Sequence, residues 1–485
     1  MKNKQTVILV AILIILLGVG ATMVIYLGTN VKQSQESSSE IDGVRTFADW
    51  TEEEVFQTIP AMIVDDTKIG KALDYGGDVY QISVDGTELA DYQAYLTTLE
   101  GCGFKKHVDN GEEGLDGAIY STTFTKDELM VTVIHAVKIN KTYITAGKDV
   151  ALSPNLFYDE SYVADNVEGA KTTLHMIELY DNGSSFVIQL KNGHFIMNDG
   201  GLANDLPYLL DYLESLVPEG EKPIIDAWFI SHVHGDHTGW LAELVSDMKN
   251  INRICVESIY FSESSESQAA ATNAAGLVRS FMSNYKMLRS SEGKAPILYR
   301  PQAGQRYYFN DLTVDVVFTQ EQLATVDMAG DYNDASTWLM YNIEGQKFLL
   351  SGDAADASSK TVMEMYDSDY FNLDLYCVFH HGINVYNYFT DYIKTKTILY
   401  TSYRCGSLYL TGSHAHPEEN EYLMSIADEI MAYGDGTKIL QFPYEIGTSI
   451  TMPKREWIYD NNTRKFGIWN ENREGQTHET HIINK

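Results

Sequence analysis

Residues 231–240 read SHVHGDHTGW, a stretch that places three histidines and one aspartate within six positions. Imidazole nitrogen and carboxylate oxygen are ligands that suit zinc and similar divalent metals. One tetrahedral ion does not comfortably use all four side chains at this spacing, so the pattern indicates two ions side by side. The alternative is a histidine-rich surface loop, which has no need of this spacing.

The residues around this stretch predict where it lies in the fold. Pro223–Ile230 is a short, mostly apolar run that is typical of a buried strand. The histidines follow directly, so we expect them at the carboxyl end of a strand, where open α/β sheets place ligands. Thr238 is a candidate N-cap for a helix that begins near Trp240.

The H-x-H-x-D-H order resembles the signature of the metallo-β-lactamase fold superfamily, a group of mostly hydrolytic metalloproteins. The resemblance covers residues 172–455 and implies an α+β fold, a four-layer αβ/βα sandwich. It also implies that His232 and His234 bind a first ion, and that Asp236 and His237 bind a second.

Two further clusters follow apolar runs in the same way. Asp353 comes after Lys347–Leu350 and matches the bridging carboxylate of the superfamily. His380 and His381 come after Leu373–Phe379. By resemblance, His381 binds the second metal and His380 faces the substrate. Each cluster alone has a respectable structural explanation, but several ligand clusters after strand ends are hard to explain by core packing.

Asp199 lies in an Asp-Gly turn of a kind that superfamily members often show. The resemblance implies that it orients a ligand histidine through a hydrogen bond. The alternative is an ordinary turn aspartate.

The chain departs from lactamase-type members, because it has no histidine between His237 and His380. In that interval the N-x-x-S element that starts at Asn333 resembles one branch of the superfamily. This branch contains the nuclease domains of competence DNA-uptake proteins and the choline-phosphate esterases. The segment at His416 resembles its H-P element. The resemblance assigns to substrate binding Asn333, Ser336, His380 and His416, and it leaves the first metal with a more open coordination shell.

These elements predict a metal-dependent hydrolase, a phosphoesterase. The predicted cofactor is a pair of divalent ions, zinc rather than manganese, bridged by Asp353 and a water that they convert to hydroxide. Asp236 and His380 are the predicted catalytic residues, with His380 donating a hydrogen bond or a proton. The branch elements favour a phosphodiester substrate. The alternatives are a thioester or lactam hydrolase, and a non-catalytic surface binding protein stabilised by metal.

The net charge of the chain argues against one class of partner, nucleic acid. The chain of 485 residues has 35 basic and 68 acidic residues, so its formal charge is 35 − 68 = −33. Tight nonspecific nucleic-acid binding is not expected, since proteins of that class usually present a basic face. The four cysteines form no C-x-x-C pair and give no zinc-ribbon or redox motif.

The N-terminal segment predicts a membrane anchor. Residues 6–28 are largely apolar, carry no charge and are long enough to cross a bilayer as a helix. Lys2 and Lys4 precede them, which places the N-terminus in the cytoplasm. A cleaved signal peptide is the alternative. We therefore expect a single-pass protein of a bacterial cell membrane, with an extracytoplasmic catalytic domain and a phosphodiester-containing substrate at or outside the cell surface.

The remaining segments complete the predicted organisation. Residues 29–45 are a polar, flexible linker. Residues 46–165 form a small α/β domain without a visible catalytic cluster, and its role is left open. Residues 456–485 form a polar C-terminal tail.

Overall fold

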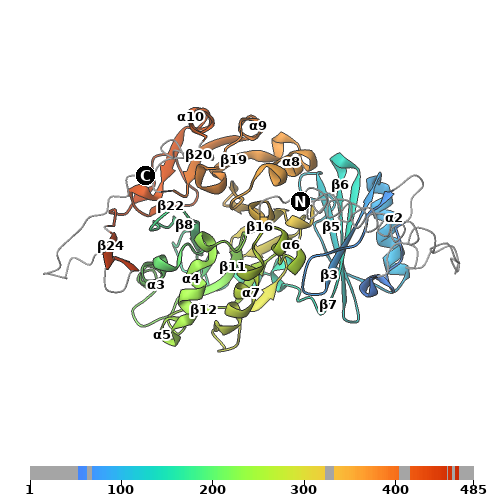
Figure 1. Ribbon diagram of the computed structural model, residues 1–485, viewed down its shortest axis with the longest axis horizontal. Helices are drawn as coiled ribbons and strands as arrows, with labels where there is room; N and C mark the ends of the chain where they lie inside the picture. The colour runs from blue at the N-terminus through green and yellow to red at the C-terminus, as the bar shows by residue number, and fades with distance from the viewer. Residues whose placement is uncertain are drawn as a thin grey trace, which may run out of the picture.

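Three large β-sheets organise the described part of the chain. The computed structural model describes residues 53–62, 68–322, 332–402, 416–455, 457–460 and 465–468. A sheet of seven strands lies in the N-terminal part, and sheets of nine and seven strands form the part that follows. These last two sheets lie between two groups of helices, with the N-terminal sheet to one side (Figure 1).

The N-terminal sheet is antiparallel, in the order β1-β3-β7-β6-β5-β4, with β2 beside β3. Its strands are Lys68–Ile69 (β1), Leu73–Asp74 (β2), Val79–Asp85 (β3), Lys105–Asp109 (β4), Ile119–Lys126 (β5), Leu129–Ala136 (β6) and Lys141–Lys148 (β7). β5 and β6 pair along their whole length as a hairpin. The helix α2, Leu89–Gly101, follows β3.

Side-chain alternation gives this sheet two buried faces. Val131 and Val133 of β6 pack in one core cluster with Leu99 of α2. Ile134 and Ala136 point to the other face and join a core cluster of the second half of the chain. The N-terminal domain is therefore packed on one side by its own helix and on the other by the C-terminal domain.

The C-terminal domain contains the other two sheets. The first has the order β14-β13-β11-β10-β9-β8-β22-β23, with β12 beside β11, and the second runs β15 to β21 in order. The first sheet contains Thr173–Met176 (β8), Ser185–Gln189 (β9), Phe195–Asp199 (β10), Ile224–Ile230 (β11), Cys255–Val256 (β12), Ser258–Phe261 (β13), Ile297–Tyr299 (β14), Lys438–Gln441 (β22) and Ile450–Thr451 (β23). The second contains Arg306–Phe309 (β15), Leu312–Phe318 (β16), Trp338–Ile343 (β17), Gln346–Leu350 (β18), Asn372–Cys377 (β19), Lys394–Tyr400 (β20) and Glu429–Ala432 (β21).

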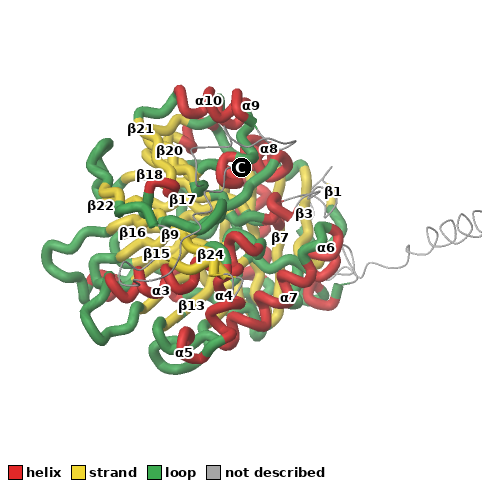
Figure 2. Tube along the Cα trace, turned by 60° about the vertical axis from the view of Figure 1, so that its left-hand side comes forward, coloured by secondary structure: helices red, strands yellow, loops and turns green. Residues whose placement is uncertain are grey.

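Helices cover the outer faces of both sheets, which gives four layers (Figures 1 and 2). On the first sheet lie Leu206–Ser215 (α3), Gly235–Ser246 (α4), Met248–Ile251 (α5), Glu266–Ala271 (α6) and Ala275–Asn284 (α7). On the second lie Asp356–Met365 (α8), Asn387–Thr390 (α9) and Pro417–Ser425 (α10). Aromatic side chains fill the space between the sheets: the rings of Phe186 and Phe348 meet edge to face at 5.6 Å.

Strand direction brings the predicted ligands to one edge. β10, β11 and β13 run parallel, and so do β18, β19 and β20. The carboxyl ends of parallel strands meet at one edge of a sheet, which is where such sheets place ligands. The end of β10 and the segments after β11, β18 and β19 carry the residues singled out in the sequence.

The helix after the histidine stretch begins earlier than the sequence predicts. α4 starts at Gly235 with His234 as its N-cap residue, and Thr238 lies inside the helix, where its Oγ1 donates to His234 O at 3.2 Å. The predicted Thr238 cap and the start near Trp240 are therefore wrong. The early start places Asp236 in the first turn, where the helix dipole favours a carboxylate.

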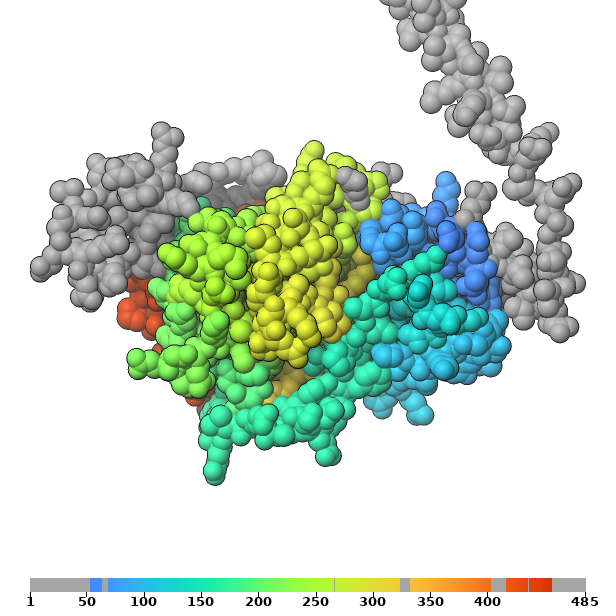
Figure 3. Space-filling model, turned by 90° about the horizontal axis from the view of Figure 1, so that it is seen from below, coloured from blue at the N-terminus to red at the C-terminus, as the bar shows by residue number. Residues whose placement is uncertain are grey.

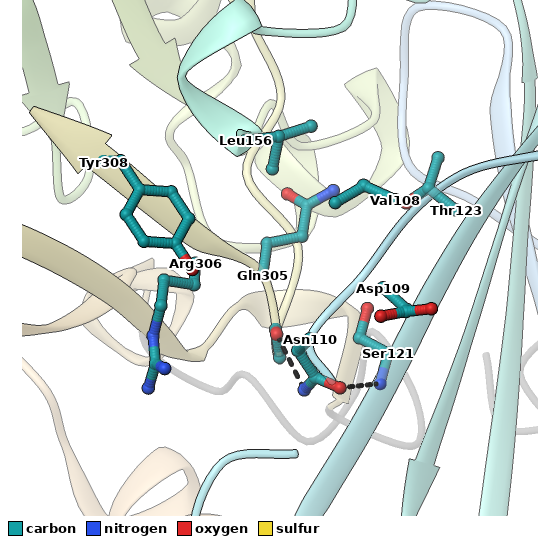
Figure 4. A pocket seen from close by; sticks show the side chains of 10 residues that line it. Val108, Asp109, Asn110, Ser121, Thr123, Leu156, Gln305, Arg306 and Tyr308 are labelled. Atoms are coloured by element: carbon teal, nitrogen blue, oxygen red, sulfur yellow. Dashed lines mark hydrogen bonds between the residues drawn. The ribbon is translucent and has the colours of Figure 1, made fainter. Parts of the chain in front are cut away.

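Polar groups line the seam between the two domains. Asn110, just after β4, donates from Nδ2 to Gly304 O at 3.0 Å, and its Oδ1 accepts from Ser121 N at 3.1 Å. These groups border a small crevice that Arg306 also lines (Figure 4). In the space-filling view the N-terminal domain lies directly against the middle of the chain (Figure 3). Specific contacts thus join the domains.

No helix in the described ranges is long and apolar enough to cross a membrane. The predicted anchor and linker, residues 6–28 and 29–45, lie outside the described residues. The predicted polar tail contains a short hairpin of two strands, Trp457–Asp460 (β24) and Lys465–Ile468 (β25), and β25 contacts α3.

Gly200 supplies a test of this packing. A Cβ at Gly200 would lie 1.1 Å from Nε1 of Trp240, which stacks on Trp228 with ring centroids 4.2 Å apart. Gly200→Ala should destabilise the fold by about 1–3 kcal/mol or more, as overpacking of a core does. Gly276→Ala is the matched control, since its Cβ meets nothing within 4 Å. Denaturant unfolding of both variants measures this, and equal stability would contradict the packing described.

Candidate metal centre

The structure brings together the residues predicted as metal ligands. They come from the loop between β11 and α4, from the first turn of α4, from the turn after β18 and from the turn after β19. The set is His232, His234, Asp236, His237, Asp353 and His381. Ligands from segments far apart in sequence therefore meet at one point of the fold.

The donors form two groups that share Asp353. In one group, His232 Nε2 lies 3.0 Å from His234 Nδ1 and 3.9 Å from Asp353 Oδ2. In the other, Asp353 Oδ1 lies 2.9 Å from His237 Nε2 and 3.4 Å from His381 Nε2. His381 Nε2 also lies 3.2 Å from Asp236 Oδ2. The two oxygens of Asp353 thus face different groups.

Several of these buried donor atoms have no hydrogen-bond partner in the described structure. They include His237 Nε2 and both carboxylate oxygens of Asp353. Buried polar atoms are nearly always hydrogen-bonded, so atoms that are unpaired yet close together need another partner. Imidazole nitrogens and carboxylate oxygens in this arrangement suit a divalent cation. The donor set therefore fits metal binding.

Asp199 holds the buried ligand His237 in place. Asp199 Oδ2 accepts from His237 Nδ1 at 2.8 Å. Ser231 donates to the same carboxylate from its backbone N and from Oγ, each at 2.8 Å. Because the Nδ1 proton of His237 is directed at Asp199, its Nε2 stays free for a metal. Asp199 thus has the contacts that the predicted orienting role requires.

Hydroxyl groups approach two other imidazoles from the Nδ1 side. Thr401 Oγ1 lies 2.9 Å from His381 Nδ1. Ser336 Oγ lies 3.3 Å from His232 Nδ1 and accepts from Asp353 N at 3.2 Å. These contacts turn each Nε2 toward the cluster. Ser336 is fully buried and orients His232, whereas its assignment to substrate binding stays a prediction.

Three residues of the centre were not singled out in the sequence. Ser231 adjoins the histidine stretch, where a hydroxyl is an available orienting group. Thr401 follows β20 directly, so the strand-end argument used for Asp353 applies to it as well. No pattern marks Tyr332, whose ring lies 5.5 Å from the ring of His234.

The charges of the centre shift the pKa values of its members. Burial works to raise the pKa of Asp353, but His237, His381 and His380 outweigh burial and hold that pKa well below its usual range. Burial works to lower the pKa of His381, but Asp353 and Asp236 raise it to about 9. His237 and His381, whose pKa values are both raised, therefore hold protons beside this carboxylate, and a cation displaces these protons when it binds.

Comparison with known families agrees with this geometry. The sequence model of the metallo-beta-lactamase superfamily matches residues 180–383. The chain contains a metallo-beta-lactamase superfamily domain. This range includes every donor of both groups. Superfamily members are usually metal-dependent hydrolases, and the donor set suits that chemistry.

Two solved structures are similar to parts of the chain. One is Zn2+-bound PqqB from Methylobacterium extorquens, with 9% identity and a TM-score of 0.25, over 40% of this chain and 58% of that one. The other is a beta-lactamase domain protein from Burkholderia ambifaria, with 14% identity and a TM-score of 0.24, over 40% of this chain and 56% of that one. The chain thus spans less than two thirds of either structure. A search of curated proteins found no match.

Within the superfamily domain, His380 and His381 both have left-handed backbone conformations, with φ of 47° and 58°. Such conformations are costly for residues other than glycine and are common at functional sites. They let adjacent imidazoles approach one carboxylate: His380 Nε2 lies 3.4 Å from Asp353 Oδ2, and His381 Nε2 lies 3.4 Å from Asp353 Oδ1. His380 belongs to neither group of potential ligands in the described structure.

The other residues assigned to substrate binding lie at different depths. Asn333 is buried in the turn before β17. His416 precedes α10, is partly exposed, and has its ring 6.3 Å from that of Tyr386. Asn420 connects this helix to the histidine turn, because its Nδ2 donates to Gly382 O at 2.9 Å. A substrate contact by Asn333 or His416 stays a prediction.

The two adjacent histidines should respond differently to substitution. His381→Ala should lower metal content, because it removes a donor of the second group. His380→Ala should keep the metal and slow turnover on the order of a hundredfold, as loss of one transition-state hydrogen bond does. Elemental analysis and kinetics of both variants measure this. Loss of metal from His380→Ala alone would reverse the two assignments.

Proposed function

We propose that the protein is a hydrolase of phosphodiester bonds that uses two divalent ions, with zinc as the first choice. The sharing of Asp353 between two groups of donors carries this proposal. His232, His234 and Asp353 Oδ2 would hold one ion, and Asp236, His237, His381 and Asp353 Oδ1 the other. When bound, such ions polarise a substrate oxygen and lower the pKa of a water to near neutrality.

The side chains of the domain supply orientation and a proton donor. Asp199, Thr401 and the serine hydroxyls hold the imidazoles with Nε2 toward the centre. The His380 side chain is 20% exposed, so a substrate can reach it. Burial lowers the pKa of His380, so the ring is neutral at neutral pH and donates one N–H. We assign to it a hydrogen bond to a phosphoryl oxygen or to the leaving group.

The choice of a phosphodiester rests on the first group of donors. That group has two histidines and one carboxylate, because the chain has no histidine between His237 and His380. Fewer protein ligands leave more positions for a substrate oxygen. A phosphoryl group offers more oxygens to such a centre than a lactam or thioester carbonyl does, so the open site favours it.

Metal removal and one substitution test the function together. Metal-loaded protein should hydrolyse bis-p-nitrophenyl phosphate, and a chelator should abolish the activity. Asp353→Ala should lose at least one ion, and its activity should fall to background. Asp369 is an exposed carboxylate, so Asp369→Ala should match the wild type in metal content and activity. Hydrolysis of a lactam or thioester but not the diester would contradict the substrate class. Chelator-resistant activity would contradict the metal mechanism.

We further propose that the domain lies outside the cytoplasm of a bacterial cell, held by an anchor at residues 6–28. Supporting this are the uncharged apolar segment and the lysines before it. Protease added to intact, wall-stripped cells should degrade the domain, while a cytoplasmic marker stays whole. Full protection of the domain would contradict this topology.

A further inference from the structure

His234 is the donor with the least support from hydrogen bonds. Asp199, Thr401 and Ser336 contact the other imidazoles. In the described part of the chain, the hydrogen-bond contact of the His234 ring is with His232. The orientation of the His234 ring therefore depends on packing against a neighbouring ring. The ring of Tyr332 supplies that packing, 5.5 Å from the His234 ring and 6.1 Å from the His232 ring.

Tyr332 is itself held by buried polar side chains. Its ring is 3% exposed, and its hydroxyl lies 3.4 Å from Ser264 Oγ. Ser264 Oγ donates to Gln320 Oε1 at 2.7 Å, and Gln320 Nε2 donates to Ser262 O at 2.9 Å. Ser262 and Ser264 follow β13, the neighbour of the strand that leads to the histidine stretch. The wall behind His234 thus combines the loop after β13 of the first sheet with Gln320 and Tyr332, which lie between β16 and β17 of the second.

A buried ion pair connects this wall to the N-terminal domain. Arg300 Nη2 donates to Glu263 O at 2.6 Å and to Tyr75 O at 2.9 Å, and Arg300 Nε donates to Glu321 Oε1 at 3.1 Å. The side chains of Arg300 and Glu321 are 8% and 1% exposed. Both oxygens of Glu321 also accept from Ser262 Oγ at 3.0 Å. A planar guanidinium offers several donors in a fixed geometry, so it sets three segments at defined positions.

We propose that Tyr332 is a positioning residue for His234, and that the N-terminal domain helps to order the metal centre through the Arg300–Glu321 pair. The inference rests on the proposed function, because it takes His232 and His234 as ligands. It gives a role to a domain whose described residues contain no group of potential metal ligands. If Tyr332 merely filled space, its loss would lower stability and leave metal affinity unchanged.

The first test measures Zn2+ affinity of the full-length protein by competition with a chromophoric chelator. Tyr332→Leu removes the ring and should weaken binding of one ion about tenfold, the lower end of the range for residues that support ligands. Tyr332→Phe is the conservative control. It keeps the ring and should bind Zn2+ with an affinity within about threefold of the wild type. Wild-type affinity in Tyr332→Leu would overturn the role of Tyr332.

The second test replaces both partners of the ion pair. Apolar replacement of a whole buried pair is often neutral for stability, so the R300M/E321M double variant should fold. It should nevertheless bind one Zn2+ about tenfold more weakly, because the anchor at Tyr75 is gone. The control is R306M/D315M, which removes an ion pair between β15 and β16 beside the crevice at the domain seam. This variant should bind zinc with wild-type affinity. Equal affinity in both double variants would overturn the role of the N-terminal domain.

These readouts separate this inference from the proposed function. A wild-type protein that binds Zn2+ but hydrolyses no phosphodiester contradicts the substrate class, and the affinities of the variants still decide the inference. A wild-type protein that binds no Zn2+ overturns both.

Discussion

The buried carboxylate of Asp353 is the constraint on which the centre depends. A charge removed from water is costly unless it is paired, and this one is 1% exposed, with the imidazoles of His237, His380 and His381 within 3.4 Å of its oxygens. The two sheets solve the problem jointly, because the first brings the histidine stretch and the second brings the carboxylate and His381. The sandwich therefore has to close before the charges are balanced.

The parts of the site and fold that could be predicted from the sequence are those with a local signal. The H-x-H-x-D-H stretch follows a strand and supplies several ligands from one turn, so spacing alone points to them. Asp353 and His381 were assigned as ligands by resemblance to the superfamily, and each also lies close after an apolar run. The strands β5, β6, β9, β11 and β18 were predictable for the same reason, since side-chain alternation and apolar runs are local signals.

The rest depends on contacts between distant segments. The contact of Ser336 with His232 joins residues 104 positions apart, and no local pattern distinguishes a buried hydroxyl from one that faces substrate. The start of α4 was misplaced because its N-cap residue, His234, makes no side-chain capping hydrogen bond and so gives no sequence signal. The sequence could not predict how the N-terminal domain packs, since nothing local shows that the second face of its sheet is buried. That burial comes from residues of the C-terminal domain, with which Ile134 shares a core cluster.

The uneven burial of the ligands has a consequence for how an ion enters and leaves. His232, His237, Asp353 and His381 are buried, whereas His234 and Asp236 are partly exposed. An ion arriving from solvent would therefore meet these two partly exposed side chains before the four buried ones. Entry of an ion and its retention would thus depend on different side chains of the same centre.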